Sequence, residues 1–308
     1  MTYHSHHSAV GDALAGVAII ASFEPASGIL GTVRELVADG HLVCIVDDAS
    51  KSAEAEAVLR ACEKLGAKLL RKTENSGIAS SLNAGLRWAT RTDVKYILTL
   101  DQDTEIPHKY FSMAIERFET LQQRGASIGA ITAGRMNGSN RRPRRPSFIE
   151  AYDEAIDVMQ SGLVTPVDIA NKLGGFRDGF VMDCVDTDFC LKLRATNYSI
   201  LWLDDLELKH ELGDTQVATV LGRPVSIRGR TIHVSNHSSS RRYYMSRNRV
   251  ILLAEYARRD REWARKARRG YLKEAILSLI FEKHRGANFL ATTRGIYHGL
   301  LRREGRAR

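Results

Sequence analysis

The stretch LTLDQDTEIP, residues 98–107, combines a buried strand with two carboxylates at its end. Its first half is mainly apolar, as expected of a strand that is covered on both faces. Asp101 and Asp103 follow directly, and Pro107 ends the extended segment because proline has no backbone N–H to donate. Polar groups at the carboxyl end of a buried strand are typical of a ligand site in an open α/β sheet.

The same organisation repeats in the residues before this stretch. Strand patterns cover 16–23, 41–50, 67–72 and 94–103, and helix patterns cover 28–40, 52–65 and 75–90. This alternation predicts an α/β fold with a Rossmann-like, mostly parallel central sheet flanked by helices. Because the carboxyl ends of parallel strands share one edge, Asp47 and Asp48 are expected near Asp101 and Asp103.

Composition adds a bound on size and a clue about partners. The chain has 308 residues, 44% of them apolar, which is enough for one large domain or two small ones. Its formal charge of +9 is concentrated in residues 257–308, which contain 15 Lys and Arg against 5 Asp and Glu. A basic tail suggests an anionic partner, either a membrane surface or a nucleic acid. The four cysteines lack zinc-site spacing, and no apolar run approaches the ~20 residues that span a bilayer.

The paired carboxylates suggest a metal site. Asp101 and Asp103 stand two positions apart, so their side chains point the same way if the strand continues through them. Carboxylate oxygens suit Mg²⁺ or Mn²⁺, ions that keep several waters and bridge substrate phosphates. A solvated polar turn is the alternative interpretation.

Three motifs together carry a family resemblance. IVDDAS (45–50), NSGIASSLNAGL (75–86) and LTLDQDTEIP occur in the order and spacing of the family-2 inverting glycosyltransferases with the GT-A fold. The sequence is most similar to the rhamnosyltransferase-like branch, and the resemblance runs from about residue 16 to residue 250. One departure is SFEP at 22–25, where many members have T-Y-N-P.

The resemblance implies roles for residues of the first half. Asp103 would be a metal ligand, and Asp48 would contact the nucleotide base. The full set of donor-binding candidates is Asp48, Asn75, Gly77, Asp101, Gln102 and Arg247. The alternative for the second motif is an ordinary helix N-terminus capped by Asn75 or Ser76.

The segment VMDCVDTDFCLKLR, residues 181–194, is similar to the family pattern F-I-D-x-V-D-x-(E/D)-(F/W)-C-x-R. By that resemblance Asp186 is the general base that inverting transfer needs, Asp188 is the alternative base, and Asp183 shapes the acceptor site. Acids also stabilise a helix N-terminus, which would account for one or two of them without any catalytic role.

Two later motifs extend the resemblance. His210 begins the family's H-x-x-G segment, which implies that it completes the metal or diphosphate site opposite Asp103. The segment HSSSRRYYMSRNRVILL (237–253) is similar to R-x-Y-Y-x-x-R-N. Arg247 is expected to pair with phosphate, and Tyr244 and Asn248 are expected at the acceptor. The alternatives are a structural histidine and a helix that docks the tail.

The tail contains two apolar stripes at helical spacing, both flanked by Arg and Lys. They are Tyr271, Leu272, Ala275, Ile276, Leu279 and Ile280, and then Phe289, Leu290, Thr293, Ile296, Tyr297, Leu300 and Leu301. This pattern is typical of helices in a membrane interface, but the stripes could equally pack on the body or on a second subunit in a homodimer. Nucleic acid is not expected as a partner, since no binding signature is present.

These observations give one hypothesis for the whole chain. A disordered lead-in (1–15) would precede a GT-A domain (16–255), with a nucleotide-sugar half (16–107) and an acceptor half (108–255), and a basic helical tail (256–308). Arginines of the segment 134–150 are expected at the rim of the active site.

The expected activity is metal-dependent inverting transfer of a sugar, L-rhamnose from dTDP-rhamnose, to a cell-surface glycan or lipid-linked precursor. It would take place in the cytoplasm at the inner face of the cell membrane. The alternatives are a UDP-sugar donor such as UDP-galactofuranose, a sugar nucleotidyltransferase, or a non-catalytic glycan-binding scaffold.

Overall fold

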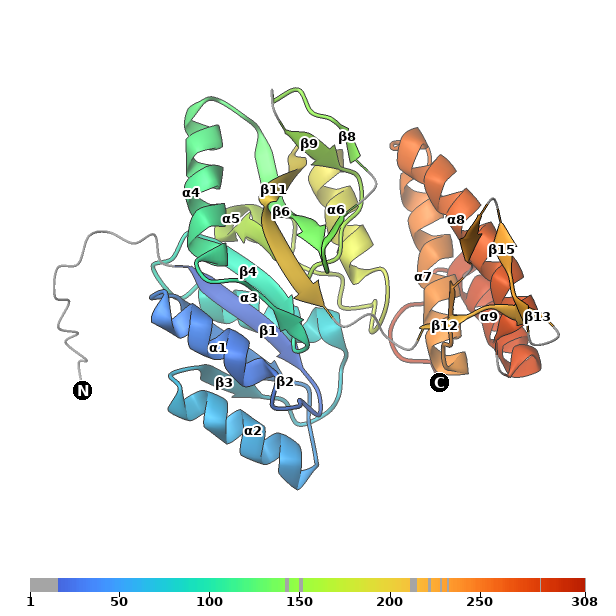
Figure 1. Cartoon of the computed structure of the whole chain (residues 1–308), viewed down its shortest axis with the longest axis horizontal. Helices are drawn as coiled ribbons and strands as arrows, with labels where there is room; N and C mark the ends of the chain where they lie inside the picture. Colours follow the sequence, from blue (N-terminus) through green and yellow to red (C-terminus); the bar gives the residue numbers. More distant parts are fainter. Residues whose placement is uncertain are drawn as a thin grey trace, which may run out of the picture.

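The computed structural model places one central sheet between two layers of helices, with a group of three further helices beside it (Figure 1). It describes residues 16–141, 144–149, 152–210, 215–220, 223–227, 229–231, 233–282 and 284–307. The expected lead-in at 1–15 lies outside the described residues.

The first half of the sheet consists of four parallel strands in the order β3-β2-β1-β4. Their bounds are β1 Val17–Ser22, β2 Leu42–Asp47, β3 Lys68–Arg71 and β4 Tyr96–Asp101, and the helices between them are α1 Ile29–Ala38, α2 Ala53–Lys64 and α3 Ile78–Ala89. Each element falls within the segment expected for it. β1 shows why: Ile19 and Ile20 are both fully buried, one in each of the two apolar clusters that cover the sheet.

The second half of the sheet is mixed. Its strands are β10 Leu163–Pro166, β6 Ile128–Met136, β11 Ser199–His210, β9 Asp153–Ala155 and β8 Arg144–Pro146, in the order β4-β10-β6-β11-β9-β8. β10 is antiparallel to β4, whereas β11 is parallel to β6. The helices α4 Tyr110–Gln123, α5 Val167–Lys172 and α6 Val185–Ala195 complete the two layers.

A short strand pairing is decisive for the site. β5 Thr104–Glu105 follows β4 and pairs antiparallel with the end of β11, where His210 lies opposite Thr104. The carboxyl end of β4 therefore meets a segment that is about a hundred positions later in the chain.

Three helices follow the sheet: α7 Ser239–Tyr256, α8 Arg261–Phe281 and α9 Arg285–Leu300. Figure 1 shows them side by side, next to α6. Small two-stranded antiparallel sheets precede them, formed by β12 Thr215–Val217 with β17 His233–Ser235, β13 Thr219–Val220 with β14 Arg223–Pro224, and β15 Ser226–Ile227 with β16 Arg230–Thr231. Within the described residues, no helix is both long and apolar enough to cross a membrane.

The segment after β6 differs from the expectation that its arginines would lie at the active-site rim. Arg141 is buried, with its guanidinium 4.9 Å from the centre of the Trp202 ring. Arg144 pairs with Asp153 and Asp204, and Arg145 with Glu154 and Glu262. For these three arginines the expectation is wrong, because Arg141 is buried against Trp202 and the charges of Arg144 and Arg145 are balanced by acids of the sheet edge and of α8.

Candidate active site

A cleft of about 650 Å³ opens where β1, β2 and β4 end, between the two halves of the sheet. Of the residues singled out in the sequence, it is lined by Asp48, Asn75, Gly77, Asp101, Asp183, Asp186 and His210. The topology explains this convergence, because parallel strands deliver their carboxyl ends to the same edge.

One wall is the loop before α3, and Asp48 holds it in place. The backbone N–H groups of Ser76 and Gly77 donate to the two Asp48 carboxylate oxygens at 2.9 and 2.8 Å. Lys72 Nζ lies 2.6 Å from the same carboxylate. Asp48 therefore shapes the loop at the edge of the cleft, and a direct contact with a base stays a prediction.

Gly77 is required by the shape of this loop. Its φ is +93°, and a Cβ there would lie 2.1 Å from the carbonyl oxygen of Val181. Only glycine fits such a close backbone approach. Gly77 is itself the N-cap of α3 and no side chain caps that helix, so the alternative of a cap by Asn75 or Ser76 is wrong.

At the opposite wall, Asp101 and His210 line the cleft and Asp103 lies beside them; the ligand atoms of all three lie within 4.8 Å of one another. His210 Nδ1 is 3.5 Å from an Asp103 oxygen and 2.8 Å from the hydroxyl of Thr104. If Nδ1 carries the hydrogen of that short bond, Nε2 keeps a lone pair for a metal ion. The pairing of β5 with β11 creates this set.

The surroundings of the Asp101 carboxyl disfavour its negative charge. Burial raises the pKa of Asp101 to about 7, and the charges of Asp103 and Asp186 act in the same direction. A hydrogen bond from Gln160 Nε2, at 2.5 Å, opposes this rise. Two carboxylates and an imidazole so close together form a set of metal ligands. A bound divalent cation would offset the repulsion between the two carboxylates.

Gln102, expected to bind the donor, instead supports the neighbouring loop. Its side-chain oxygen accepts from the backbone N–H of Phe23 at 2.8 Å, and its amide donates to the Phe23 carbonyl at 3.1 Å. These two hydrogen bonds to the backbone hold Phe23 at the cleft, where 47% of the residue is exposed. The segment SFEP thus keeps an aromatic residue at the second position, as T-Y-N-P does, where a nucleotide base could stack.

The third wall is the loop that leads into α6. Asp183 and Cys184 have φ values of +60° and +62°, in the left-handed region that side chains disfavour. Asn248 stabilises this strained turn by donating from its amide to the carbonyls of Met182 and Asp183, at 2.8 and 2.9 Å. Strain of this kind is commonly stored at functional sites.

Asp186 lies in the first turn of α6 and lines the cleft. Burial, together with the nearby charge of Asp183, raises the pKa of Asp186 to about 6. A second carboxyl, Asp157, accepts weak hydrogen bonds from Thr187 and Trp263, and burial together with Asp186 raises its pKa as well. No sequence motif contains Asp157, which precedes β10 in the chain.

Asp188, expected as the alternative base, does not lie at the cleft. Asp188 is fully buried between Arg177 and Lys192, with ion pairs of 3.3 and 3.0 Å, so it does not face the cleft. Its position corrects the alternative choice of base, because a charge-paired side chain in the core cannot reach an acceptor.

Arg247, Tyr244 and Asn248 support the site from behind. Arg247 is 1% exposed and donates to the carbonyls of Gly305 and Gly179, so the expected phosphate contact is corrected to a structural one. The Tyr244 hydroxyl accepts from the backbone N–H of Ala307 at 3.0 Å. Together they anchor residues 304–307, a segment that returns over the body of the protein.

Arg306 of this returning segment contacts a residue that lines the cleft. Arg306 donates to the Asn75 side chain at 2.7 Å, and the backbone N–H of Gly305 donates to the Gly179 carbonyl at 2.9 Å. Only the folded chain shows this contact, since Arg306 and Asn75 are 231 positions apart.

Arg241 is the other arginine that the sequence reasoning missed. It lines the cleft and is bound to Asp183 by contacts of 3.1 to 3.3 Å. The signal existed, because Arg241 is the first position of the R-x-Y-Y-x-x-R-N pattern.

Comparisons with known proteins agree with this geometry. The dTDP-rhamnosyl transferase RfbF of Shigella flexneri is 25% identical over 255 residues, which cover 77% of this chain and 79% of that protein. The mannosyltransferase PcManGT of Pyrobaculum calidifontis, solved with GDP-Man and Mn²⁺, superposes with a TM-score of 0.54 at 18% identity, over 94% of this chain and 74% of that one.

GalNAc-T7, solved with UDP, GalNAc and Mn²⁺, gives a TM-score of 0.55 at 13% identity over 79% of this chain. This chain spans only about half of that structure, 48% of its length. Similarity at this level shows the shared GT-A fold. The model of the family described as Glycosyl transferase family 2 matches residues 17–190, more than half of the chain. The chain therefore belongs to glycosyl transferase family 2 and is a glycosyltransferase that resembles the rhamnosyltransferases.

Proposed function

We propose that this glycosyltransferase moves L-rhamnose from dTDP-rhamnose, with inversion, to a hydroxyl of a cell-surface glycan or a lipid-linked precursor. The observation that carries the proposal is the cleft itself, which has the set Asp101, Asp103 and His210 on one wall and Asp186 on another. The choice of rhamnose is supported by the similarity to RfbF. A UDP-sugar donor such as UDP-galactofuranose is the second candidate, because Asp48 stands where rhamnosyltransferase-like members often have asparagine.

We further propose that transfer depends on Mg²⁺ or Mn²⁺ held by Asp101, Asp103 and Nε2 of His210. Burial and the neighbouring carboxylates, which together raise the pKa of Asp101, fit this set of ligands. When bound there, the cation would balance negative charge on the donor diphosphate. Two neighbours that share the fold were solved with Mn²⁺, which supports the same dependence here.

The residues of the third wall supply the proton chemistry. Asp186, with its pKa near 6, is ionised at neutral pH and can accept the proton of the acceptor hydroxyl. The acceptor oxygen then forms a bond to the anomeric carbon, the bond from that carbon to the diphosphate breaks, and the configuration inverts. Asp183 and its partner Arg241 border the space where the acceptor would lie.

The test is a donor screen with a catalytic control. The purified chain is heated with dTDP-rhamnose, UDP-galactofuranose, UDP-glucose or GDP-mannose, each with and without Mn²⁺, and the unfolding temperature is measured. We expect stabilisation by dTDP-rhamnose only when Mn²⁺ is present. Stabilisation by the UDP-sugar alone would establish the second candidate, and equal stabilisation with and without the cation would refute metal dependence.

A further inference from the structure

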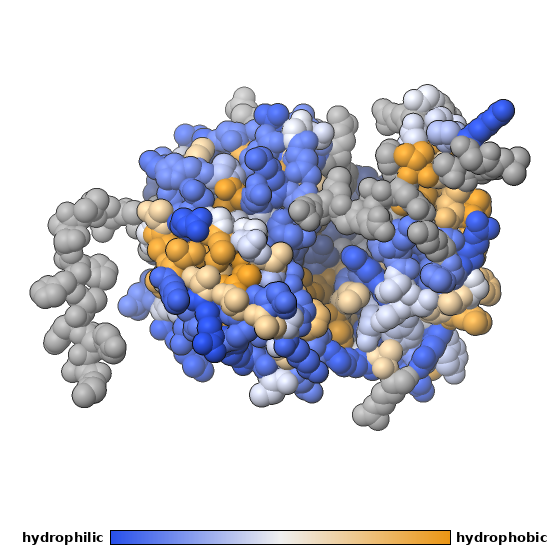
Figure 2. Space-filling view, turned by 60° about the horizontal axis from the view of Figure 1, so that its bottom comes forward, coloured by the Kyte–Doolittle hydropathy of each residue, from blue (hydrophilic) through white to orange (hydrophobic). Residues whose placement is uncertain are grey.

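The helices α8 and α9 expose their apolar side chains to the outside. The exposed ones are Leu272, Ile276, Leu279 and Ile280 on α8, Phe289, Leu290, Ile296, Tyr297 and Leu300 on α9, and Leu301 directly after α9. Leu272, Leu290 and Leu300 are 64%, 69% and 70% exposed. Figure 2 shows apolar surface on this part of the molecule, at the right of the view. We call these ten residues the outer face.

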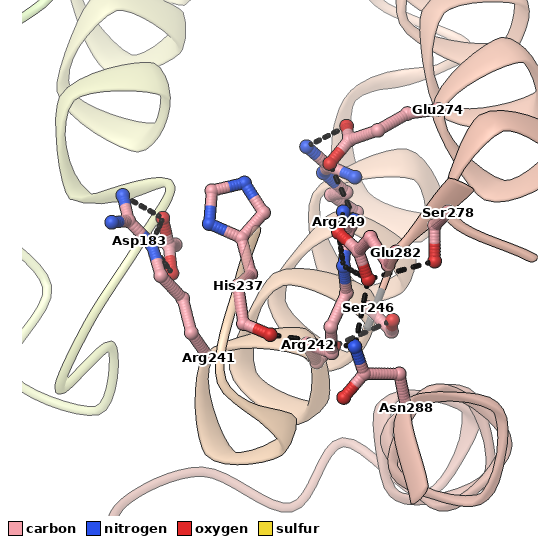
Figure 3. Close-up of polar contacts among 10 residues, drawn as sticks. All are labelled: Asp183, His237, Arg241, Arg242, Ser246, Arg249, Glu274, Ser278, Glu282 and Asn288. Atoms are coloured by element: carbon pink, nitrogen blue, oxygen red, sulfur yellow. Dashed lines mark hydrogen bonds and ion pairs between the residues drawn. The ribbon is translucent and has the colours of Figure 1, made fainter. Parts of the chain in front are cut away.

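Near α7 these helices bury the polar residues Ser278, Glu282 and Asn288, whereas a helix in water usually buries apolar side chains. Arg242 of α7 is buried and pairs with both Glu274, at 2.6 Å, and Glu282. Arg249, about two helical turns further along α7, lies 2.6 Å from Glu274. Asn288 of α9 donates to Glu282 at 2.7 Å, so one connected network joins all three helices (Figure 3).

This network fixes which way the helices face. Separating a buried, hydrogen-bonded ion pair leaves an uncompensated charge and is strongly destabilising. α9 is held as firmly, because a Cβ on Gly295 would lie 2.4 Å from the carbonyl oxygen of Tyr243, and one on Gly299 2.7 Å from that of Arg247. α9 therefore packs on α7 through its glycines, and its large apolar side chains have no room on the inner side.

The outer face is continuous and is bordered by positive charge. Leu279, Phe289 and Ile296 line one shared apolar groove of about 380 Å³ between the helices. On α8, the exposed Arg268 and Arg269 continue the line of Leu272 towards the N-terminus, and neither has a carboxylate partner within the part of the chain that the structure describes.

We propose that the outer face binds the surface of a lipid bilayer with anionic headgroups. Apolar side chains would enter the boundary between headgroups and acyl chains, while the arginines of α8 contact lipid phosphates. The charge argues for lipid and against a second copy of this chain. A symmetric dimer through this face would bring together two tails that each carry 15 basic and 5 acidic residues.

The arrangement connects the bilayer to the chemistry. α7 carries Arg242 on the side of α8 and α9, and Arg241 on the side of Asp183 and the cleft (Figure 3). A chain bound through the outer face would hold its cleft beside the membrane, which suits a lipid-linked acceptor. Binding of the bilayer does not depend on the proposed donor or acceptor.

The experiment is vesicle flotation of the full chain without nucleotide. Vesicles contain either phosphatidylcholine alone or phosphatidylcholine with about one third phosphatidylglycerol, a fraction chosen to give a strongly negative surface. We expect the wild type to float with the anionic vesicles, and Leu272→Gln/Leu290→Gln/Leu300→Gln to lose at least tenfold in partition coefficient. The matched control is Met113→Gln, which replaces an apolar residue of similar size on α4, 38% exposed, and should float like the wild type.

A second variant tests the charge. Arg268→Gln/Arg269→Gln should reduce flotation with anionic vesicles several-fold and leave binding to neutral vesicles unchanged. The proposal is overturned if the wild type does not float, or if the triple variant floats as well as the wild type. It is also overturned if sedimentation shows a wild-type dimer that the triple variant abolishes, since the outer face would then be a subunit interface.

Discussion

Replacing Gln160 with methionine should weaken metal binding at neutral pH through the pKa of Asp101. Gln160 donates a 2.5 Å hydrogen bond to the Asp101 carboxylate, and this bond opposes the burial that raises the pKa of that group to about 7. A hydrogen bond to a charged group contributes ~1.5–3 kcal/mol. Since one pKa unit corresponds to ~1.4 kcal/mol, the variant should raise the pKa of Asp101 by at least about one further unit.

The direction of the pH dependence follows from competition between the proton and the cation for the Asp101 carboxylate. Below its pKa Asp101 is protonated and cannot bind metal, so the affinity for Mn²⁺ must rise with pH. With a pKa of about 7, the ionised fraction of Asp101 is roughly one tenth at pH 6 and nine tenths at pH 8, and the wild-type affinity should rise about tenfold across this range. Gln160→Met should shift the dependence of Mn²⁺ affinity on pH by about one pH unit towards higher pH. The affinity at pH 7 should then be roughly fivefold lower.

The assay is a titration of the full chain with Mn²⁺, in which the free ion is quantified by its electron paramagnetic resonance signal at pH 6, 7 and 8. Gln122→Met is the control, because Gln122 is exposed at the end of α4, and it should behave as the wild type. Circular dichroism establishes that both variants are folded. A wild-type affinity that is equal at pH 6 and pH 8, or identical curves for Gln160→Met and wild type, would refute the reasoning.

Three further predictions concern the walls of the cleft. Asp186→Asn should keep nucleotide binding but lower transfer ~10²–10⁴-fold, and the wild-type rate should fall as the pH drops through about 6; normal turnover by the variant would exclude Asp186 as the base. Gly77→Ala should destabilise the chain by ~1–3 kcal/mol in urea unfolding, whereas Gly31→Ala, with open space at its Cβ, should not; equal effects would contradict the loop argument. Arg306→Gln should weaken nucleotide binding roughly fivefold by calorimetry, and the exposed Arg303→Gln should not; matching affinities would show that Arg306 has no part in the site.

The sequence determined the local elements and the place of the cleft. Continuous apolar runs and helical periodicity predicted every strand and helix from β1 to β4, because these patterns depend on spacing along the chain. Aspartates at the ends of two parallel strands located the site, since such strands end at one edge of the sheet. Family membership and the glycosyltransferase class also followed from ordered motifs.

The tertiary structure decided which of the expected residues meet. His210 reaches Asp103 only through the pairing of β5 with β11, and Arg306 reaches Asn75 across 231 positions. Asp188 and Arg247 carry the residue types of a site but are buried as structural groups. The two motifs that contain these residues could not show that they are buried. Helical periodicity determines the face on which a side chain lies, but not what covers that face.

The tail also shows the difference between what the sequence determines and what the tertiary structure determines. Its sequence showed two apolar stripes and an excess of positive charge, and it left the body, a second subunit and a membrane as possible partners. Only the folded chain shows that α7 meets α8 and α9 through buried ion pairs and glycines, which leaves the stripes outside. Amphipathicity is a local property of each helix, whereas the side that turns inward depends on which groups of other helices can satisfy its charges and fit its shape.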